Sequence, residues 1–117
     1  MTKQLRNLLS PAELEAIREF ELELRKCYRV VQLRLFGSTA RGESDEESDM
    51  DVLIVLADKV THRIRNNISD IAFEINLKYE TNISVVVFDE ETWNNGVLKL
   101  TSFYSEVVRD GVAIYEA

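Results

Sequence analysis

The sequence predicts an α/β (α+β) fold, in which helices flank a small mixed β-sheet in the order α-β-α-β-α-β-α-β. Three observations support this class. Apolar residues recur at helical spacing in two long segments, at about 11–28 and 60–79. Two short apolar runs, 30–36 and 83–88, have the length and composition of strands. A third run, 50–56, is apolar almost throughout, as expected of an interior strand buried on both faces.

The first long helix has a clear start signal. Ser10 can cap it, Pro11 suits the first helical position and Glu13 can close a capping box. Residues 1–9 are expected to be a loose lead-in to this helix. Its apolar stripe includes Cys27, which we therefore expect in the core.

The last third of the chain predicts a short helical turn at 90–94, a helix with apolar residues over 100–108 and a short edge strand at 112–115. Gly111 follows this helix, and we expect it to form a left-handed cap. The only histidine, His62, has no cysteine or second histidine in metal-ligand spacing. It therefore predicts a surface residue and not a zinc site.

Composition limits the partners of this chain, which we interpret as a single domain over 1–117. Its formal net charge of -7 argues against direct binding to a nucleic-acid backbone, which requires clustered Lys and Arg. A nucleotide carried by Mg²⁺ remains compatible, since the metal supplies positive charge. The single cysteine, the absence of an apolar run near the ~20 residues of a membrane span and the lack of a signal-peptide pattern predict a cytoplasmic protein without a membrane segment.

Two aspartates open the interior strand. Because successive side chains of a strand point to opposite faces, Asp49 and Asp51 are expected to point the same way. Their separation suits the sharing of one or two divalent ions, and an all-oxygen site favours Mg²⁺ or Mn²⁺ over zinc. Without metal the two carboxylates would repel each other and raise the pKa of one of them.

A Gly-Ser pair stands where the first strand ends. Gly37 leaves room for close approach by a ligand, and Ser38 begins a short helix whose N–H groups favour a phosphate. Arg41, one turn further on, is in a position to reach the same anion. Gly-Ser and D-x-D are each common, but their combination at this spacing is restrictive. The chain contains neither a P-loop nor a dinucleotide-binding fingerprint.

The stretch FGSTARGESDEESDMDVLIVL resembles the G-S-x₁₀-D-x-D signature of the DNA polymerase β-like nucleotidyltransferase superfamily, in its minimal (MNT) form. The long helices on either side of it and the ending SFYSEVVRDGVAIYE extend the resemblance to nearly the whole chain. The resemblance implies that Gly37 and Ser38 hold the phosphates of a nucleotide and that Asp49 and Asp51 bind two Mg²⁺. Such a site would promote in-line displacement at the α-phosphate, with pyrophosphate leaving.

The resemblance also implies a partner. Many minimal members are antitoxins of a neighbouring HEPN-domain protein, and some transfer AMP from ATP to a tyrosine of that protein. The expected function is therefore transfer of a nucleotidyl group, AMP from ATP or from another NTP, to a hydroxyl of a HEPN-type partner. The alternative is a catalytically weak or inactive nucleotide-binding antitoxin that acts by direct contact. Larger relatives carry a further domain that holds base and acceptor, so a homo- or hetero-oligomer is expected to supply that surface here.

One position departs from the family pattern. The superfamily usually has a third carboxylate on the next core strand, where this chain has Ser84, in ISVV instead of the frequent VDVV. A serine neither accepts a proton at neutral pH nor replaces a carboxylate at a metal. Asp89, just past this strand, and Glu74, on the preceding helix, are the alternatives, although a solvent-facing place is expected for both.

Overall fold

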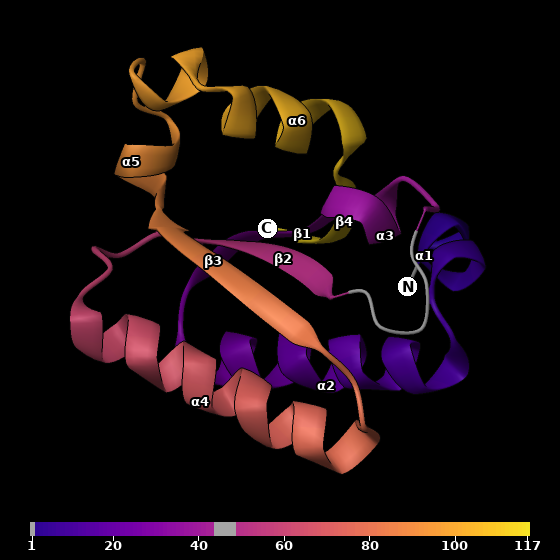
Figure 1. The fold of residues 1–117 in the computed structure, drawn as a ribbon. Coiled ribbons are helices and arrows are strands. Elements are labelled where there is room, and N and C mark those ends of the chain that lie inside the picture. Colours follow the sequence, from indigo (N-terminus) through magenta and orange to yellow (C-terminus); the bar gives the residue numbers. More distant parts are fainter. Residues whose placement is uncertain (1, 44–48) are drawn as a thin grey trace.

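The computed structural model describes residues 2–43 and 49–117. A four-stranded mixed sheet, in the order β3-β2-β1-β4, separates two layers of helices (Figure 1). The pairs β1–β2 and β1–β4 are antiparallel, and β2–β3 is parallel. The strands are β1 (Val30–Phe36), β2 (Met50–Leu56), β3 (Ile83–Asp89) and β4 (Val112–Glu116). The helices are α1 (Lys3–Leu8), α2 (Pro11–Cys27), α3 (Gly37–Ala40), α4 (His62–Tyr79), α5 (Glu90–Trp93) and α6 (Ser102–Asp110), with a 3₁₀ turn, η1 (Leu98–Leu100).

The predicted fold class is confirmed, and so is the interior position of the third apolar run. β2 lies between β1 and β3, and every residue in it except Asp51 is buried. The edge strand predicted after the last helix is β4, which pairs with β1. The capping box at Ser10 is present, because its hydroxyl accepts from the N–H of Glu13 and the Glu13 carboxylate accepts from the N–H of Ser10.

Two predictions about α1 and α2 are wrong. The first nine residues are not a loose lead-in, because α1 forms there and buries Leu5 and Leu9 against the core. Leu5 lies within α1, and Leu9 is the extended residue that directly follows it. Cys27 is exposed, since the buried stripe of α2 ends one turn earlier, at Leu24.

The prediction of a left-handed cap at Gly111 is also wrong. Its backbone is extended, with φ -64° and ψ 138°. A side chain at position 111 is excluded by lack of space and not by the backbone conformation. A Cβ at this position would overlap the carbonyl oxygen of Val107 and would lie 2.8 Å from Nε of Arg34. The glycine therefore lets the Arg34 guanidinium pack against the end of α6, where its Nη2 donates to the carbonyl oxygen of Gly111.

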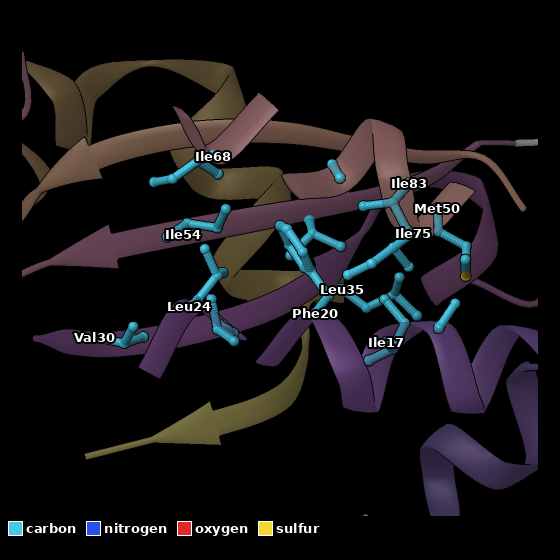
Figure 2. Packing of buried hydrophobic residues seen from close by; sticks show 14 of the residues in the cluster. Ile17, Phe20, Leu24, Val30, Leu35, Met50, Ile54, Ile68, Ile75 and Ile83 are labelled. Atoms are coloured by element: carbon cyan, nitrogen blue, oxygen red, sulfur yellow. The ribbon is translucent and has the colours of Figure 1, made fainter. Parts of the chain in front are cut away.

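Each face of the sheet has its own apolar cluster. α2 and α4 cover one face, and Figure 2 shows Phe20 of α2 and Ile68 of α4 packed with Leu35 and Ile54 of the sheet. The other face carries a smaller cluster under α5 and α6. Its buried members are Leu53, Val55, Trp93 and Val107. Alternate residues of β2 thus enter different clusters, which explains why this strand is apolar almost throughout.

The longest helix, α4, connects the two parallel strands. Thr61 caps its start, and Ile68, Ala72 and Ile75 form its buried face. Its outer face is mostly polar, as predicted. No helix within residues 2–43 and 49–117 has the length and apolar character needed to cross a membrane.

α4 ends at Glu80 in the left-handed conformation, with φ 54° and ψ 47°. This conformation costs a residue with a Cβ about 1–2 kcal/mol and costs glycine much less. We therefore expect Glu80→Gly to raise the free energy of unfolding by about 0.5–1 kcal/mol, after the greater chain entropy of glycine is subtracted. Glu80→Ala, which keeps the Cβ, is the control. Urea unfolding measures both variants, and equal midpoints would contradict the prediction.

Candidate active site

The two aspartates of the D-x-D pair lie at the end of the sheet where β1 ends and β2 begins. Asp49 directly precedes β2, and Asp51 is the second residue of the strand, paired with Phe36 at the end of β1. Asp51 has the same parity as Leu53 and Val55, so it faces the α6 side of the sheet. Asp49 is exposed and Asp51 is half-buried. By the strand period Asp49 would face the same side, and its charge lies near enough to Asp51 to raise the pKa of that carboxyl.

Gly37, the first residue of α3, lies directly against Asp51. Its φ is +76°, a conformation that residues with a Cβ rarely adopt. A Cβ built on Gly37 would also overlap carboxylate oxygen Oδ2 of Asp51. The glycine is thus required both by the backbone turn and by the space that the carboxylate takes. The structure brings together the two halves of the sequence motif, which are separated by more than ten residues.

Burial, and after it the charge of Asp49, raise the pKa of Asp51 above its usual value. Both effects disfavour the ionised carboxylate in the protein alone, and a bound cation would relieve both. The residues present fit a hard divalent cation, because the donors are two carboxylates on one face. The described ranges contain no group of three His, Cys, Asp or Glu side chains suited to a metal.

The other predicted phosphate ligands lie on α3. Ser38 follows Gly37 and is partly exposed. Arg41, at the end of this turn, contacts two carboxylates: its Nε lies 3.2 Å from Glu43 Oε2 and its Nη1 lies 3.8 Å from Asp110 Oδ2. Arg41 therefore links α3 to the C-terminal end of α6 in this structure.

Ser84 stands beside Asp51. The parallel register of β2 and β3 pairs these two residues, so their side chains share the face that α6 covers. Ser84 is exposed. The position that the family pattern indicates for a third carboxylate is therefore next to the aspartate pair, and it carries a hydroxyl.

Neither alternative carboxylate takes the place of Ser84. Asp89 is in register with Leu56 at the other end of the sheet, five residues or about 16 Å along the strand, and points to the opposite face. Its carboxylate caps α5, accepting from the N–H of Thr92 at 2.8 Å, and hydrogen bonding by Thr92 holds its pKa below the usual value. Glu74 is exposed on α4, which covers the far face of the sheet (Figure 1).

Two residues that the sequence did not single out hold the chain around the pair. Thr39 of α3 is buried, and its Oγ1 donates to the carbonyl oxygen of Asp49 at 3.1 Å. The Asn76 side chain of α4 binds both backbone groups of Ile83, accepting from its N–H at 2.7 Å and donating to its carbonyl oxygen at 3.1 Å. Neither residue carries a signal in the sequence beyond being polar in a segment rich in polar residues.

The mixed sheet thus brings an aspartate pair at the start of the buried strand β2 next to the glycine turn that follows β1. A family model described as the nucleotidyltransferase domain matches residues 17–112, and the chain belongs to this family. The recognition of the minimal nucleotidyltransferase pattern in the sequence is thereby confirmed.

Individual relatives agree with this assignment. A protein of Methanocaldococcus jannaschii, provisionally named a protein adenylyltransferase, is 38% identical over 106 residues, which are 86% of this chain and 97% of the relative. A solved structure provisionally named a minimal nucleotidyltransferase is 26% identical, with a TM-score of 0.55 over 85% of this chain and 90% of the other.

A second solved structure shares the fold at lower identity. It contains a tri-AMPylated HEPN toxin of Shewanella oneidensis in complex with an MNT antitoxin. The similarity has a TM-score of 0.55 at 17% identity and covers 91% of this chain and 73% of the matched chain.

Proposed function

We propose that this nucleotidyltransferase transfers AMP from ATP, with Mg²⁺, to a hydroxyl of a HEPN-type partner protein, as the antitoxin of a toxin–antitoxin pair. The observation that carries the proposal is the pair Asp49 and Asp51 at the start of β2, with the Asp51 carboxylate packed against Gly37. The name of the M. jannaschii relative and the AMPylated toxin in the S. oneidensis complex support the choice of AMP and of the partner.

Asp49 and Asp51 would hold the metal, two Mg²⁺ by the family pattern, with Mn²⁺ as a substitute. When bound, the ions neutralise charge on the phosphates and on the leaving group. Gly37 leaves room for the nucleotide near Asp51, and the Ser38 hydroxyl is available to donate to a phosphate oxygen. Arg41 is assigned to the same phosphates, which it would reach by exchanging the Asp110 carboxylate for a phosphate oxygen.

In the proposed reaction the acceptor oxygen bonds to the α-phosphorus, and the bond from that phosphorus to the bridging oxygen of pyrophosphate breaks. The acceptor hydroxyl must also lose its proton. Ser84 cannot take this proton at neutral pH, Asp89 lies five residues along β3 from Ser84, and Glu74 belongs to α4, which covers the other face of the sheet. We propose that the proton passes to water, since none of these three residues is placed to take it in the part of the chain that the structure describes, and a slow reaction is expected.

The hydroxyl of Ser84, at the position where the family pattern has a third carboxylate, favours a second candidate function. This candidate is an antitoxin that binds a nucleotide weakly and neutralises its partner by contact. Either function requires a hetero-oligomer with the partner. The acidic balance of the chain, with a net charge of -7, supports a protein partner and an NTP over direct contact with nucleic acid. A cytoplasmic location would supply ATP and keep the single cysteine reduced.

Labelling of the partner tests the proposal. Purified protein, Mg²⁺, α-labelled ATP and the HEPN-type protein are incubated together, and label on the partner is measured by mass and by autoradiography. We expect Asp49→Asn to lower the labelling rate by at least about 10²-fold, because it removes one of the two metal ligands. Asp70→Asn, which removes an exposed carboxylate on the outer side of α4, is the matched control.

Equal labelling by the wild type and Asp49→Asn would exclude catalysis by this pair. If the partner is never labelled, and Asp49→Asn inhibits it as strongly as the wild type does, the contact antitoxin is the correct function.

A further inference from the structure

Of the two peptide units between the candidate metal ligands Asp49 and Asp51, the first is hydrogen-bonded through both of its polar groups. It is the unit between Asp49 and Met50, and it is held from two sides. Its carbonyl oxygen accepts from Thr39 Oγ1 at 3.1 Å, and its N–H donates to the carbonyl oxygen of Asn82 at 2.7 Å. Since the peptide unit is planar, the two bonds together fix its orientation.

Thr39 belongs to the same short helix as Gly37, and this helix contacts both aspartates. Gly37 borders the carboxylate of Asp51, and Thr39 binds the carbonyl group of Asp49. Thr39 is only 1% exposed, one of two buried polar residues in the part of the chain that the structure describes. A hydroxyl at such a place is expected to be held by a hydrogen bond, and the bond it makes reaches the residue that begins the D-x-D pair.

The opposite side of the peptide unit is equally well anchored. Asn82 directly precedes Ile83, whose two backbone groups are bound by the Asn76 amide. The segment around Asn82, whose carbonyl oxygen accepts from the N–H of Met50, is thereby held on α4. Of the two bonds to the unit, the one from Thr39 is made by a side chain and can be removed by a substitution that leaves the backbone intact.

We propose that Thr39 is a positioning residue: its hydroxyl fixes the Asp49–Met50 peptide and, through it, the relative directions of the Asp49 and Asp51 carboxylates. This inference rests on the proposed function, in which these carboxylates bind metal. Thr39 does not touch the metal. Its role is that of a residue that hydrogen-bonds a metal-binding residue and so orients it. Loss of such a residue typically lowers metal affinity or activity about 10–100-fold.

Two variants separate the hydroxyl of Thr39 from its methyl group. Thr39→Val keeps the shape and loses the donor, whereas Thr39→Ser keeps the donor and loses the methyl group. Mn²⁺ binding to each protein, without partner or ATP, is followed by the loss of the spectrum of the free ion in electron paramagnetic resonance. We expect Thr39→Val to weaken Mn²⁺ binding about 10–100-fold and Thr39→Ser to stay near the wild type.

A second measurement does not depend on metal. Hydrogen exchange of the Met50 amide reports how firmly the peptide unit is held, and we expect faster exchange in Thr39→Val than in Thr39→Ser. Thermal unfolding verifies that each variant is folded, and Thr39→Ala replaces Thr39→Val if the latter does not fold.

The outcomes separate this inference from the proposed function. Wild-type Mn²⁺ binding that Asp51→Asn does not change would overturn the metal site, and the Met50 exchange would still decide whether Thr39 holds the peptide. Where Asp51→Asn does abolish binding, wild-type affinity in Thr39→Val overturns the positioning role. Equal losses in Thr39→Val and Thr39→Ser also overturn it, because the loss in Thr39→Ser, which keeps the hydroxyl, would show that the fit of the whole side chain and not the hydrogen bond decides the affinity.

Discussion

Ser84→Asp is expected to raise the rate of AMP transfer, by about 10²-fold, the lower end of the range for a positioned general base. Ser84 is in register with Asp51 on the face that α6 covers, so an aspartate there would place a third carboxylate beside the pair. It would supply both a further metal ligand and an acceptor for the proton of the attacking hydroxyl. Single-turnover labelling of the partner with ATP and Mg²⁺ measures the rate.

Ser84→Asn is the matched control, because asparagine has the size of aspartate without its charge. An increase in both variants would point to altered shape rather than to a base. No increase in either variant would mean that proton removal at this position does not limit the reaction, and the contact antitoxin would gain support.

Asp51→Asn is expected to have opposite effects on activity and on stability. Labelling should fall by at least about 10²-fold, since a neutral amide is a poor ligand for Mg²⁺. In the absence of metal the variant should be more stable than the wild type at neutral pH. Burial and the charge of Asp49 raise the pKa of Asp51 in the folded protein, so the ionised carboxylate weakens the wild-type fold and the amide does not.

The sign of the pH dependence follows from this shift. A folded-state pKa above the unfolded value means that the folded protein binds the proton more tightly. The stabilisation by the neutral form of Asp51 is complete below the unfolded pKa and is lost as the pH rises through the folded pKa. The free energy of unfolding of the metal-free wild type should therefore include a decrease over this interval that Asp51→Asn lacks.

Bound Mg²⁺ is expected to reverse the order of stability of the wild type and Asp51→Asn. Saturating Mg²⁺ should stabilise the wild type, because a ligand that binds only the folded state adds RT ln(1 + [L]/Kd), and should leave Asp51→Asn unchanged. Thermal melting with Mg²⁺ or with a chelator measures both proteins, with Asp70→Asn as a control for general loss of charge. A metal-free wild type as stable as Asp51→Asn would contradict the effect of burial on Asp51.

Most of the fold followed from local patterns in the sequence. The strands at Val30 and Met50 and the capping box at Ser10 depend on neighbouring residues, and they were placed correctly because strand period and cap chemistry are local properties. The errors at Leu5 and Gly111 concern residues whose place depends on distant partners. Leu5 is buried by elements that come later in the chain, and Gly111 is required by the side chain of Arg34.

The candidate site divides in the same way. The sequence identified Gly37, Asp49 and Asp51, and the strand period predicted that the aspartates share a face. It left open whether Asp89 or Glu74 replaces the missing carboxylate. Only strand register and the side of the sheet answer this question, because residues near in sequence can lie at opposite ends or faces of a sheet.

By itself, the sequence determined the class of this protein: a small nucleotidyltransferase fold with a G-S-x₁₀-D-x-D motif and a serine at the third carboxylate position. The tertiary structure decided how those residues meet. It packs Gly37 against Asp51, pairs Ser84 with the same aspartate and binds Thr39 to Asp49. These contacts join three separate elements, and a pattern read along one chain cannot specify them, since they depend on the register in which the strands pair.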